Sequence, residues 1–373
     1  MKILSSIDSF KGSISSQLAN QIVKDSLPQH EVTVFPISDG GEGLVEAFIN
    51  LEEGEKIVQK MTNVNGHLTQ GHWGWIEKEQ TAVIEAAEGA GLVYANSETL
   101  HPKNHTSYGM GEQILQALDK GATTLILGLG GTATIDGGMG MLQALGCVFY
   151  NQNKKALPIL PISLENVESI NLTGLDSRLN QVSIIVASDV INPLCGKNGA
   201  VHIFGEQKGL PLNEMASYDQ EMNHYRKVVE KTTGKIKANY PGAGAAGGIG
   251  FALLSFFDCL FKSGINVLAE RGKLEEKIKA SDIVITGEGK FDLQSFQGKV
   301  PVGISRIASK YRVPTILFVG KVENHLVDVP KENIVAIIPI VDSPMSLKEA
   351  MDKGPYLLEK SIKRSFRLID LKQ

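Results

Sequence analysis

Carboxylates, lysines and glycines gather in short segments of the chain, each directly after a run of residues typical of a β-strand. Carboxylates bind Mg²⁺ directly or through water, and lysines and backbone N–H groups neutralise phosphate oxygens. A carboxylate can also accept the proton of an attacking hydroxyl, and glycine lets the backbone approach a ligand. This mixture is what phosphoryl transfer requires. The segments are residues 8–13 (DSFKGS), 38–43 (SDGGEG), 128–138 (GLGGTATIDGG), 188–193 (SDVINP) and 286–292 (TGEGKFD).

A single such segment would be weak support, because Asp and Gly are ordinary turn residues. Several at strand ends carry more weight. The carboxyl ends of parallel strands lie at one edge of a sheet, and ligands of α/β proteins bind there. We therefore expect the segments to converge.

The elements that must position these segments follow two different patterns. Both ends of the chain alternate strand, loop and helix, whereas residues 56–88 carry β-like runs with turn residues between them. We predict an α/β protein of two domains. Residues 1–58 and 272–373 form a discontinuous Rossmann- or flavodoxin-like domain, and residues 59–271 form an inserted α/β domain with a mixed sheet.

Composition excludes several classes of protein. The formal net charge of −4 leaves no basic surplus to neutralise a phosphate backbone, so no nucleic-acid partner is expected. No run of about 18 apolar residues occurs, so no membrane association is expected. The first apolar stretch is too short for a signal peptide and is interrupted by Asp8, and the cysteines are few and widely spaced. These features predict a cytoplasmic location. The signatures of P-loop enzymes and of protein kinases are absent.

Residues 242–247 (GAGAAG) match the G-x-G-x-x-G fingerprint of dinucleotide-binding proteins. That fingerprint should follow a hydrophobic strand, but here it follows KIKANYP, so we interpret it as a tight entry into a helix over residues 246–259. An NAD(P)-dependent oxidoreductase of a small hydroxy acid remains the alternative function. A non-catalytic nucleotide-binding sensor is a third hypothesis, which the number of acidic segments disfavours.

Arginines are few, so lysines and helix N-termini must bind the anionic groups of a substrate. For each lysine, the ordinary interpretation is a solvated surface charge. That interpretation is strong for Lys208 and weaker for Lys11, which lies at a strand-to-helix turn. The lysines inside or beside the glycine-rich segments are Lys11, Lys197, Lys208, Lys290 and Lys299.

Taken together, these segments resemble the bacterial glycerate kinase family, the type that makes 2-phosphoglycerate. Thr132 and Ile135 stand where that family often has Ser and Asn, so a polar side chain at position 135 is not required. Ser188 and Glu206 stand where it often has Cys and Pro. The matching blocks, in order, are DSFKGS, SDGGEG, EAAEGAGL, TSYGMGE, GGTATIDGGMGMLQALG, NPLCGKNGA, FGEQKG, PGAGAAGGIGFAL, ITGEGKFDLQSFQGKVPVGI and PMSLKEAM.

The resemblance implies two domains with an active site in the cleft between them, and ATP, Mg²⁺ and D-glycerate as ligands. It implies direct in-line transfer to give 2-phosphoglycerate, with 3-phosphoglycerate or another hydroxy acid as alternatives, by a monomer or homodimer. Asp8 or Asp189 is the expected general base, and Lys11 neutralises phosphate or binds the glycerate carboxylate. The expected Mg²⁺ ligands are Asp39, Glu42, Glu288 and Asp292, and the expected substrate- and phosphate-binding residues are Ser9, Ser13, Gly130, Gly131, Thr132, Thr134, Asp136, Lys290 and Lys299.

Overall fold

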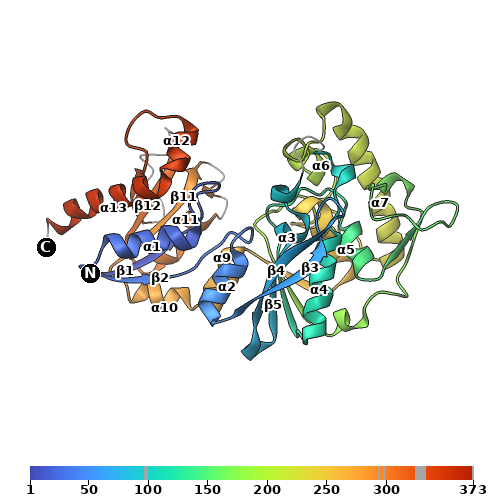
Figure 1. The fold of residues 1–373 in the computed structure, drawn as a ribbon, viewed down its shortest axis with the longest axis horizontal. Coiled ribbons are helices and arrows are strands. Elements are labelled where there is room, and N and C mark those ends of the chain that lie inside the picture. The colour runs from blue at the N-terminus through green and yellow to red at the C-terminus, as the bar shows by residue number, and fades with distance from the viewer. Residues whose placement is uncertain (96–99, 293–294, 297–298, 324–332, 372–373) are drawn as a thin grey trace. The chain divides into compact units, whose positions relative to one another are not determined.

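The structure, a computed structural model, describes residues 1–95, 100–292, 295–296, 299–323 and 333–371. Part of the block ITGEGKFDLQSFQGKVPVGI lies outside these residues. The chain folds into two compact units (Figure 1). The sequence analysis predicts domain boundaries after residues 58 and 271; the two units of the structure divide the chain at other residues. Unit 1 comprises Met1–Asp39, Glu46–Glu52 and Ser263–Gln373, and unit 2 comprises Gly40–Val45 and Glu53–Lys262.

Unit 1 is built on a five-stranded parallel sheet of order β13-β12-β11-β1-β2. Its central strands are buried on both faces, as parallel strands covered by helices must be, and this explains their nearly continuous apolar runs. The strands are β1 (Lys2–Ile7), β2 (Glu31–Val34), β11 (Ile283–Phe291), β12 (Thr315–Val322) and β13 (Ile334–Pro339).

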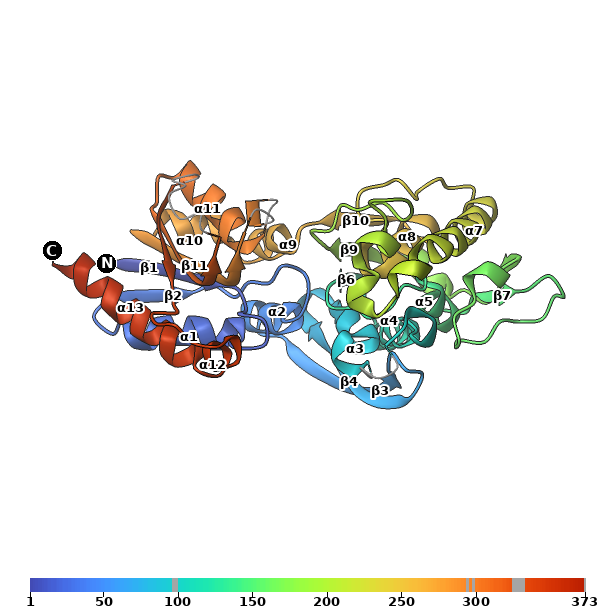
Figure 2. The same cartoon turned by 90° about the horizontal axis from the view of Figure 1, so that it is seen from above.

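Helices cover both faces of this sheet (Figure 2). On one face, α1 and α13 bury residues such as Val23 and Phe366 against Ile3 and Ile285. On the other face, α11 packs Val302 against strand residues of β11 and β12. The side chain of Ser15 caps α1, which therefore begins at Ser16. The helices are α1 (Ser16–Ser26), α9 (Gly264–Arg271), α10 (Leu274–Lys279), α11 (Val300–Lys310), α12 (Leu347–Asp352) and α13 (Gly354–Asp370); α2 (Leu44–Glu52) begins in unit 2 and ends in unit 1.

Unit 2 is built on a six-stranded mixed sheet of order β10-β9-β6-β5-β4-β3. β5, β6, β9 and β10 are parallel, while β3 and β4 add an antiparallel extension. The β-like runs of residues 56–88 are therefore strands, and the α/β class with one parallel and one mixed sheet is confirmed. The strands are β3 (Glu55–Thr62), β4 (Leu68–Ile76), β5 (Thr81–Glu85), β6 (Thr124–Gly128), β9 (Ser183–Ala187) and β10 (Cys259–Lys262).

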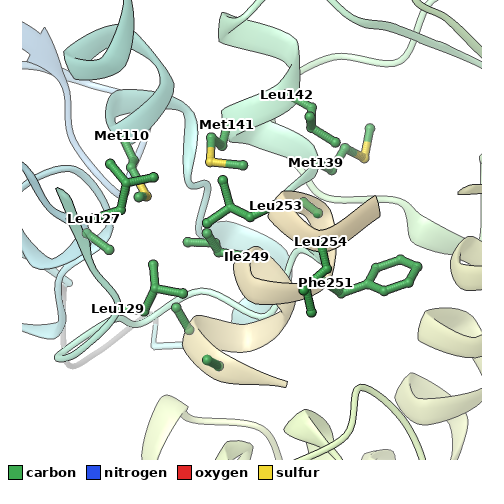
Figure 3. Close-up of a cluster of buried hydrophobic side chains, with 14 of the residues drawn as sticks. Met110, Leu127, Leu129, Met139, Met141, Leu142, Ile249, Phe251, Leu253 and Leu254 are labelled. Atoms are coloured by element: carbon green, nitrogen blue, oxygen red, sulfur yellow. The ribbon is translucent and has the colours of Figure 1, made fainter. Parts of the chain in front are cut away.

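The core of unit 2 joins the sheet to its helices (Figure 3). Met139 and Met141 are fully buried there, in contact with the cluster that includes Ile249 and Leu253. Three strands were not predicted: β10, where the helix over residues 246–259 was expected to end, and the short paired strands β7 and β8. The remaining elements are α3 (Ala86–Ala90), α4 (Tyr108–Lys120), α5 (Met139–Ala144), α6 (Ala200–Phe204), α7 (Met215–Thr233), α8 (Ile249–Phe256), β7 (Val148–Tyr150) and β8 (Ser169–Asn171).

The dinucleotide-like fingerprint at residues 242–247 packs against residues 130–138, called here segment 130–138. The N–H of Gly137 donates to the carbonyl of Gly247 (3.0 Å). A Cβ on Gly247 would lie 1.9 Å from the carbonyl oxygen of Thr134. Left-handed torsions at residues 246–248 delay the start of α8 to Ile249, later than predicted. No strand precedes the fingerprint, because residues 234–241 are irregular. Its glycines serve backbone packing.

No helix in the described part of the chain is long and apolar enough to cross a membrane.

A pair of glycine substitutions tests this packing role. Gly247 (φ +65°) and Gly234 (φ +69°) have nearly equal torsions, but nothing lies within 4 Å of a Cβ on Gly234. Gly234→Ala should cost about 1–2 kcal/mol from the left-handed torsion. Gly247→Ala should cost about 1–3 kcal/mol more, because the methyl group overlaps backbone that cannot move aside. Thermal unfolding of both variants gives the comparison; equal losses would contradict the proposed contact.

Candidate active site

The parallel register of β1 and β11 places two acidic residues side by side. Ile7 pairs with Gly287, and the N–H of Asp8 donates to the carbonyl of Gly287 (3.0 Å). The next residues along the two strands, Asp8 and Glu288, therefore lie at the same edge of the sheet. They are 8% and 6% exposed. Two of the predicted strand-end segments are thus brought together within unit 1.

Burial shifts the ionisation of both carboxyl groups. Burial, and next the neighbouring charge of Asp39, raises the pKa of Asp8 to about 8, although the N–H of Ser9 and the ammonium of Lys11 oppose the shift. Burial also raises the pKa of Glu288, against a hydrogen bond from Ser295 Oγ (2.5 Å) and the charge of Lys299. At this edge burial therefore disfavours the ionised forms of both carboxyl groups, and a nearby positive charge would favour them.

Three lysines of unit 1 partly offset this negative charge. Lys11 Nζ lies 3.3 Å from Asp39 Oδ2, and the Lys11 side chain is 75% exposed. Lys299 Nζ lies 3.7 Å from Glu288 Oε2 and 3.9 Å from Asp292 Oδ1. Lys290 Nζ lies 2.9 Å from Asp292 Oδ2. All three lie beside carboxylates of unit 1.

The segment DSFKGS is fixed by the C-terminal part of the chain. Ser13 Oγ donates to the carbonyl of Met351 (2.6 Å), and the N–H of Phe10 donates to the carbonyl of Ile14 (2.9 Å). The block PMSLKEAM, which had no assigned role, therefore supports the turn that carries Lys11. Ser9, whose N–H donates to Asp8 Oδ1 (2.7 Å), is half-buried beside it.

In unit 2, segment 130–138 begins at the end of β6 and exposes its first glycines. Gly131 is exposed and Gly130 half-buried, whereas Thr132 is 4% exposed. The segment is held on one side by residues of the EAAEGAGL block: the N–H of Leu92 donates to the carbonyl of Gly131 (3.0 Å), and that of Ala133 to the carbonyl of Ala90 (2.7 Å). Gly130 and Gly131 are therefore the accessible part of the segment.

Asp136, which was predicted to bind phosphate, is buried and hydrogen-bonded within unit 2. Its carboxylate has no exposed surface and accepts hydrogen bonds from Ser107 N and Oγ (2.9 and 2.6 Å), Gly138 N (3.0 Å) and Gly140 N (3.2 Å). Burial raises its pKa and these bonds oppose the shift. A buried carboxylate that already accepts these bonds organises the start of α5. The side chain of Thr134 is likewise fully buried.

Lys208 lies beneath segment 130–138, and the prediction of a solvated surface charge was wrong. It is 3% exposed. Its Nζ donates to Thr132 Oγ1 (3.0 Å) and to the carbonyl of Thr134 (2.9 Å). Burial lowers the pKa of Lys208 to about 7, and Asp136 opposes the shift. No local pattern marks this burial, because Lys208 ends a single short 3₁₀ turn (Glu206–Lys208).

The segment SDGGEG passes from unit 1 to unit 2 between Asp39 and Gly40. Gly40 lies against the end of β9, where a Cβ would stand 2.7 Å from the carbonyl oxygen of Ala187. Glu42 is exposed. Asp189 is half-buried just after β9, in unit 2. The ends of β6 and β9 thus gather three of the predicted segments within this unit.

The acidic residues expected to bind Mg²⁺ are divided between the two units. Asp39, Glu288 and Asp292 belong to unit 1 and Glu42 to unit 2. Among the described residues, no group of three or more His, Cys, Asp or Glu side chains is arranged to hold a metal ion. Glu288 and Asp292 lie on either side of Lys299. Because Mg²⁺ commonly takes one or two carboxylates together with substrate phosphates, this donor set fits an ion that arrives with a nucleotide.

Comparisons with known proteins agree with the motifs. The model of the Glycerate kinase family matches residues 3–370. A glycerate 2-kinase of Escherichia coli (strain K12) is 41% identical over 360 residues, covering 95% of this chain and 94% of its own. A glycerate kinase of Haemophilus influenzae is 37% identical and covers 100% of both chains. The crystal structure of a candidate glycerate kinase 2 from Salmonella typhimurium LT2 superposes with a TM-score of 0.84 at 33% identity, covering 100% and 99% of the two chains. The resemblance read from the sequence blocks is confirmed, and the chain belongs to the glycerate kinase family.

Proposed function

We propose that this protein is an ATP-dependent phosphotransferase that transfers the γ-phosphoryl group of ATP to a hydroxyl of D-glycerate, giving 2-phosphoglycerate. The family match over residues 3–370 carries the proposal. The choice of the 2-hydroxyl rests on the relative named glycerate 2-kinase, and 3-phosphoglycerate is the less favoured product. The NAD(P)-dependent oxidoreductase is not supported, because the fingerprint at residues 242–247 follows no strand and packs against backbone.

Asp8 is our first candidate for the general base. It stands at the end of a buried strand, and its raised pKa of about 8 suits a group that accepts a proton near neutral pH. Asp189 remains the second candidate, at the end of β9. Lys11, whose side chain is 75% exposed, would bind a phosphate or the glycerate carboxylate in exchange for its contact with Asp39.

Segment 130–138 is the proposed cradle for an oxyanion. Its accessible residues, Gly130 and Gly131, offer backbone N–H groups. Asp136 and the side chain of Thr134 support the segment from inside. Ser9 and Ser13 hold the turn that carries Lys11, and Lys290 and Lys299 neutralise charge at the edge of the unit 1 sheet.

Magnesium would be held by Glu288 and Asp292, with Asp39 and Glu42 as further candidates, and when bound it neutralises charge on the transferring phosphoryl group. Lys299, between Glu288 and Asp292, keeps these carboxylates oriented. The partners in this proposal are two small molecules, D-glycerate and ATP. The cytoplasmic location and the monomeric or homodimeric state stay predictions from the sequence.

The first test is turnover itself. The purified protein with ATP, Mg²⁺ and D-glycerate should release ADP at a rate that depends on D-glycerate, and phosphorus NMR should assign the phosphate to the 2-position. A 3-phosphate would overturn the choice of hydroxyl but keep the reaction class. Folded protein without D-glycerate-dependent turnover would contradict the proposed substrate.

Lys11→Ala tests the role of the exposed ammonium. Loss of one preorganised charge at a phosphoryl-transfer site should lower kcat about 100-fold or more. Because the Lys11 side chain is 75% exposed, the thermal midpoint should barely change. Lys24→Ala is the matched control, since Lys24 is an exposed lysine of α1 in the same unit. A Lys11→Ala protein with full turnover would reject the assignment.

Asp8→Asn should remove a pH dependence of stability. The Asp8 carboxyl titrates near 3.8 when unfolded and near 8 when folded, so between these values the unfolded state binds fewer protons. Stability then falls as pH rises from about 4 to about 8. Asparagine keeps the acceptor for the N–H of Ser9 but cannot ionise. Asp8→Asn should therefore melt several degrees above the wild type at pH 8 and close to it at pH 4, while losing turnover. Parallel melting curves at all pH values would show that Asp8 is ionised in the folded protein.

A further inference from the structure

Lys208 is a buried lysine whose amino group binds one short stretch of the chain. Its Nζ donates to Thr132 Oγ1 (3.0 Å) and to the carbonyl of Thr134 (2.9 Å), two residues apart on segment 130–138. One amino group therefore bridges a side chain and a main-chain atom of the same loop. Either protonation state of the amine has the two N–H donors that this bridge needs.

Contacts with neighbouring residues hold the backbone and side chain of Lys208 in place. The N–H of Lys208 donates to the carbonyl of Gly205 (3.0 Å), and its Nζ lies 6.0 Å from the centre of the Phe204 ring. On its other side, segment 130–138 is held by the backbone of Ala90 and Leu92. The accessible glycines thus lie between a backbone support and the Lys208 bridge.

Fold stability alone gives little reason for a lysine here. In the described part of the chain, no carboxylate lies within 4.0 Å of Lys208 Nζ, and both of its hydrogen-bond acceptors are neutral. Asp136 acts on it only at longer range, and His105, whose ring is buried beside Ala133, is a further titratable neighbour. Burying a lysine without an ion pair costs free energy that an apolar side chain of similar size would not.

We propose that Lys208 is a positioning residue for the reaction: its bonds to Thr132 and Thr134 hold residues 130–134 in the conformation that presents the backbone N–H groups of Gly130 and Gly131 to an oxyanion of the substrates. The inference rests on the proposed function, in which these residues bind an oxyanion. The anion is either a phosphate of ATP or the carboxylate of D-glycerate. A displacement of about 1 Å of such a loop is enough to cost roughly 100-fold in rate.

Lys208→Met tests the proposal, because methionine fills the same space without a donor. Lys103→Met is the matched control, since Lys103 is a partly buried lysine of the same unit that pairs with Glu221 (3.0 Å) and Glu165 (3.7 Å), not with the loop. We expect kcat/KM to fall about 100-fold in Lys208→Met and less than threefold in Lys103→Met. A rise in KM for ATP alone identifies the phosphate as the anion, and a rise for D-glycerate alone identifies the carboxylate. A Lys208→Met protein within threefold of the wild type overturns the proposal.

A double-mutant cycle with Thr132→Val distinguishes positioning from a merely structural role. If Lys208 acts through the Thr132 hydroxyl, Thr132→Val should add little to the loss in Lys208→Met, whereas independent effects would multiply. Multiplied losses overturn the proposal. If Lys208→Met does not fold, the activities of Thr132→Val and Thr132→Ser are compared instead. Serine keeps the hydroxyl that accepts the bond from Lys208, so Thr132→Ser should keep most of the activity.

Amide hydrogen exchange separates failure of this inference from failure of the proposed substrate. Exchange of residues 130–136 should quicken at least about tenfold in Lys208→Met and stay unchanged in Lys103→Met, whether or not the wild type phosphorylates D-glycerate. Inorganic phosphate is the probe for the anion: it should slow this exchange in the wild type and not in Lys208→Met. Unchanged exchange of the loop in Lys208→Met overturns the positioning role even in an enzyme that phosphorylates D-glycerate.

Discussion

The register between β1 and β11 is the constraint on which the chemistry of unit 1 depends. Once Ile7 pairs with Gly287, Asp8 and Glu288 must emerge together at the carboxyl edge of a sheet buried on both faces. Two carboxyl groups so placed resist ionisation. Neighbouring groups partly stabilise the ionised carboxylates: Ser295 donates a hydrogen bond to Glu288, and Lys299 lies between Glu288 and Asp292. An edge that needs cations is a suitable place for lysines, and for a metal ion that arrives with phosphates.

Unit 2 is proposed to bind an anion, whereas unit 1 is proposed to bind a cation. An oxyanion is bound by backbone N–H groups that do not already donate to an acceptor within the protein. Asp136 takes the N–H groups of Gly138 and Gly140, so the later part of segment 130–138 is committed to starting α5. The accessible amides are those nearer β6. Their conformation depends on the supports around them, namely the backbone at Ala90 and Leu92, the close approach of Gly247, and Lys208. The blocks EAAEGAGL, PGAGAAGGIGFAL and FGEQKG thus all act on one loop.

The sequence predicted what depends on local patterns. Continuous apolar runs marked the parallel strands, and the segments after them marked the edges where Asp8, Glu288 and Gly130 lie. Local patterns could not predict long-range contacts. The sequence around Lys208 is typical of a surface lysine. Its burial depends on Thr132 and Thr134, which lie far from it in the sequence and contact it only in the folded chain. Asp136 looked like a ligand because it stands among glycines, but those glycines donate to it. Strand β10 was missed because its apolar residues continue the pattern of α8, which ends at Phe256.

The direction of the pKa shifts separates ionised groups that stabilise the fold from groups whose ionised form burial disfavours. The pKa of Asp176 is lowered by Arg178, and that of Asp342 by Lys360, so in these pairs the folded state favours the ionised forms. Asp8 and Lys208 are shifted the other way, and burial disfavours their charged forms. Asp136 marks the limit of this distinction, because its burial is balanced by hydrogen bonds from Ser107, Gly138 and Gly140. Within the described residues, Asp8 accepts a backbone hydrogen bond from Ser9, and the two acceptors that Lys208 Nζ contacts are neutral. Burial of Asp8 and Lys208 therefore weakens the fold, and the proposed function gives a reason for each: Asp8 is the candidate base, and Lys208 positions the residues that would bind an oxyanion.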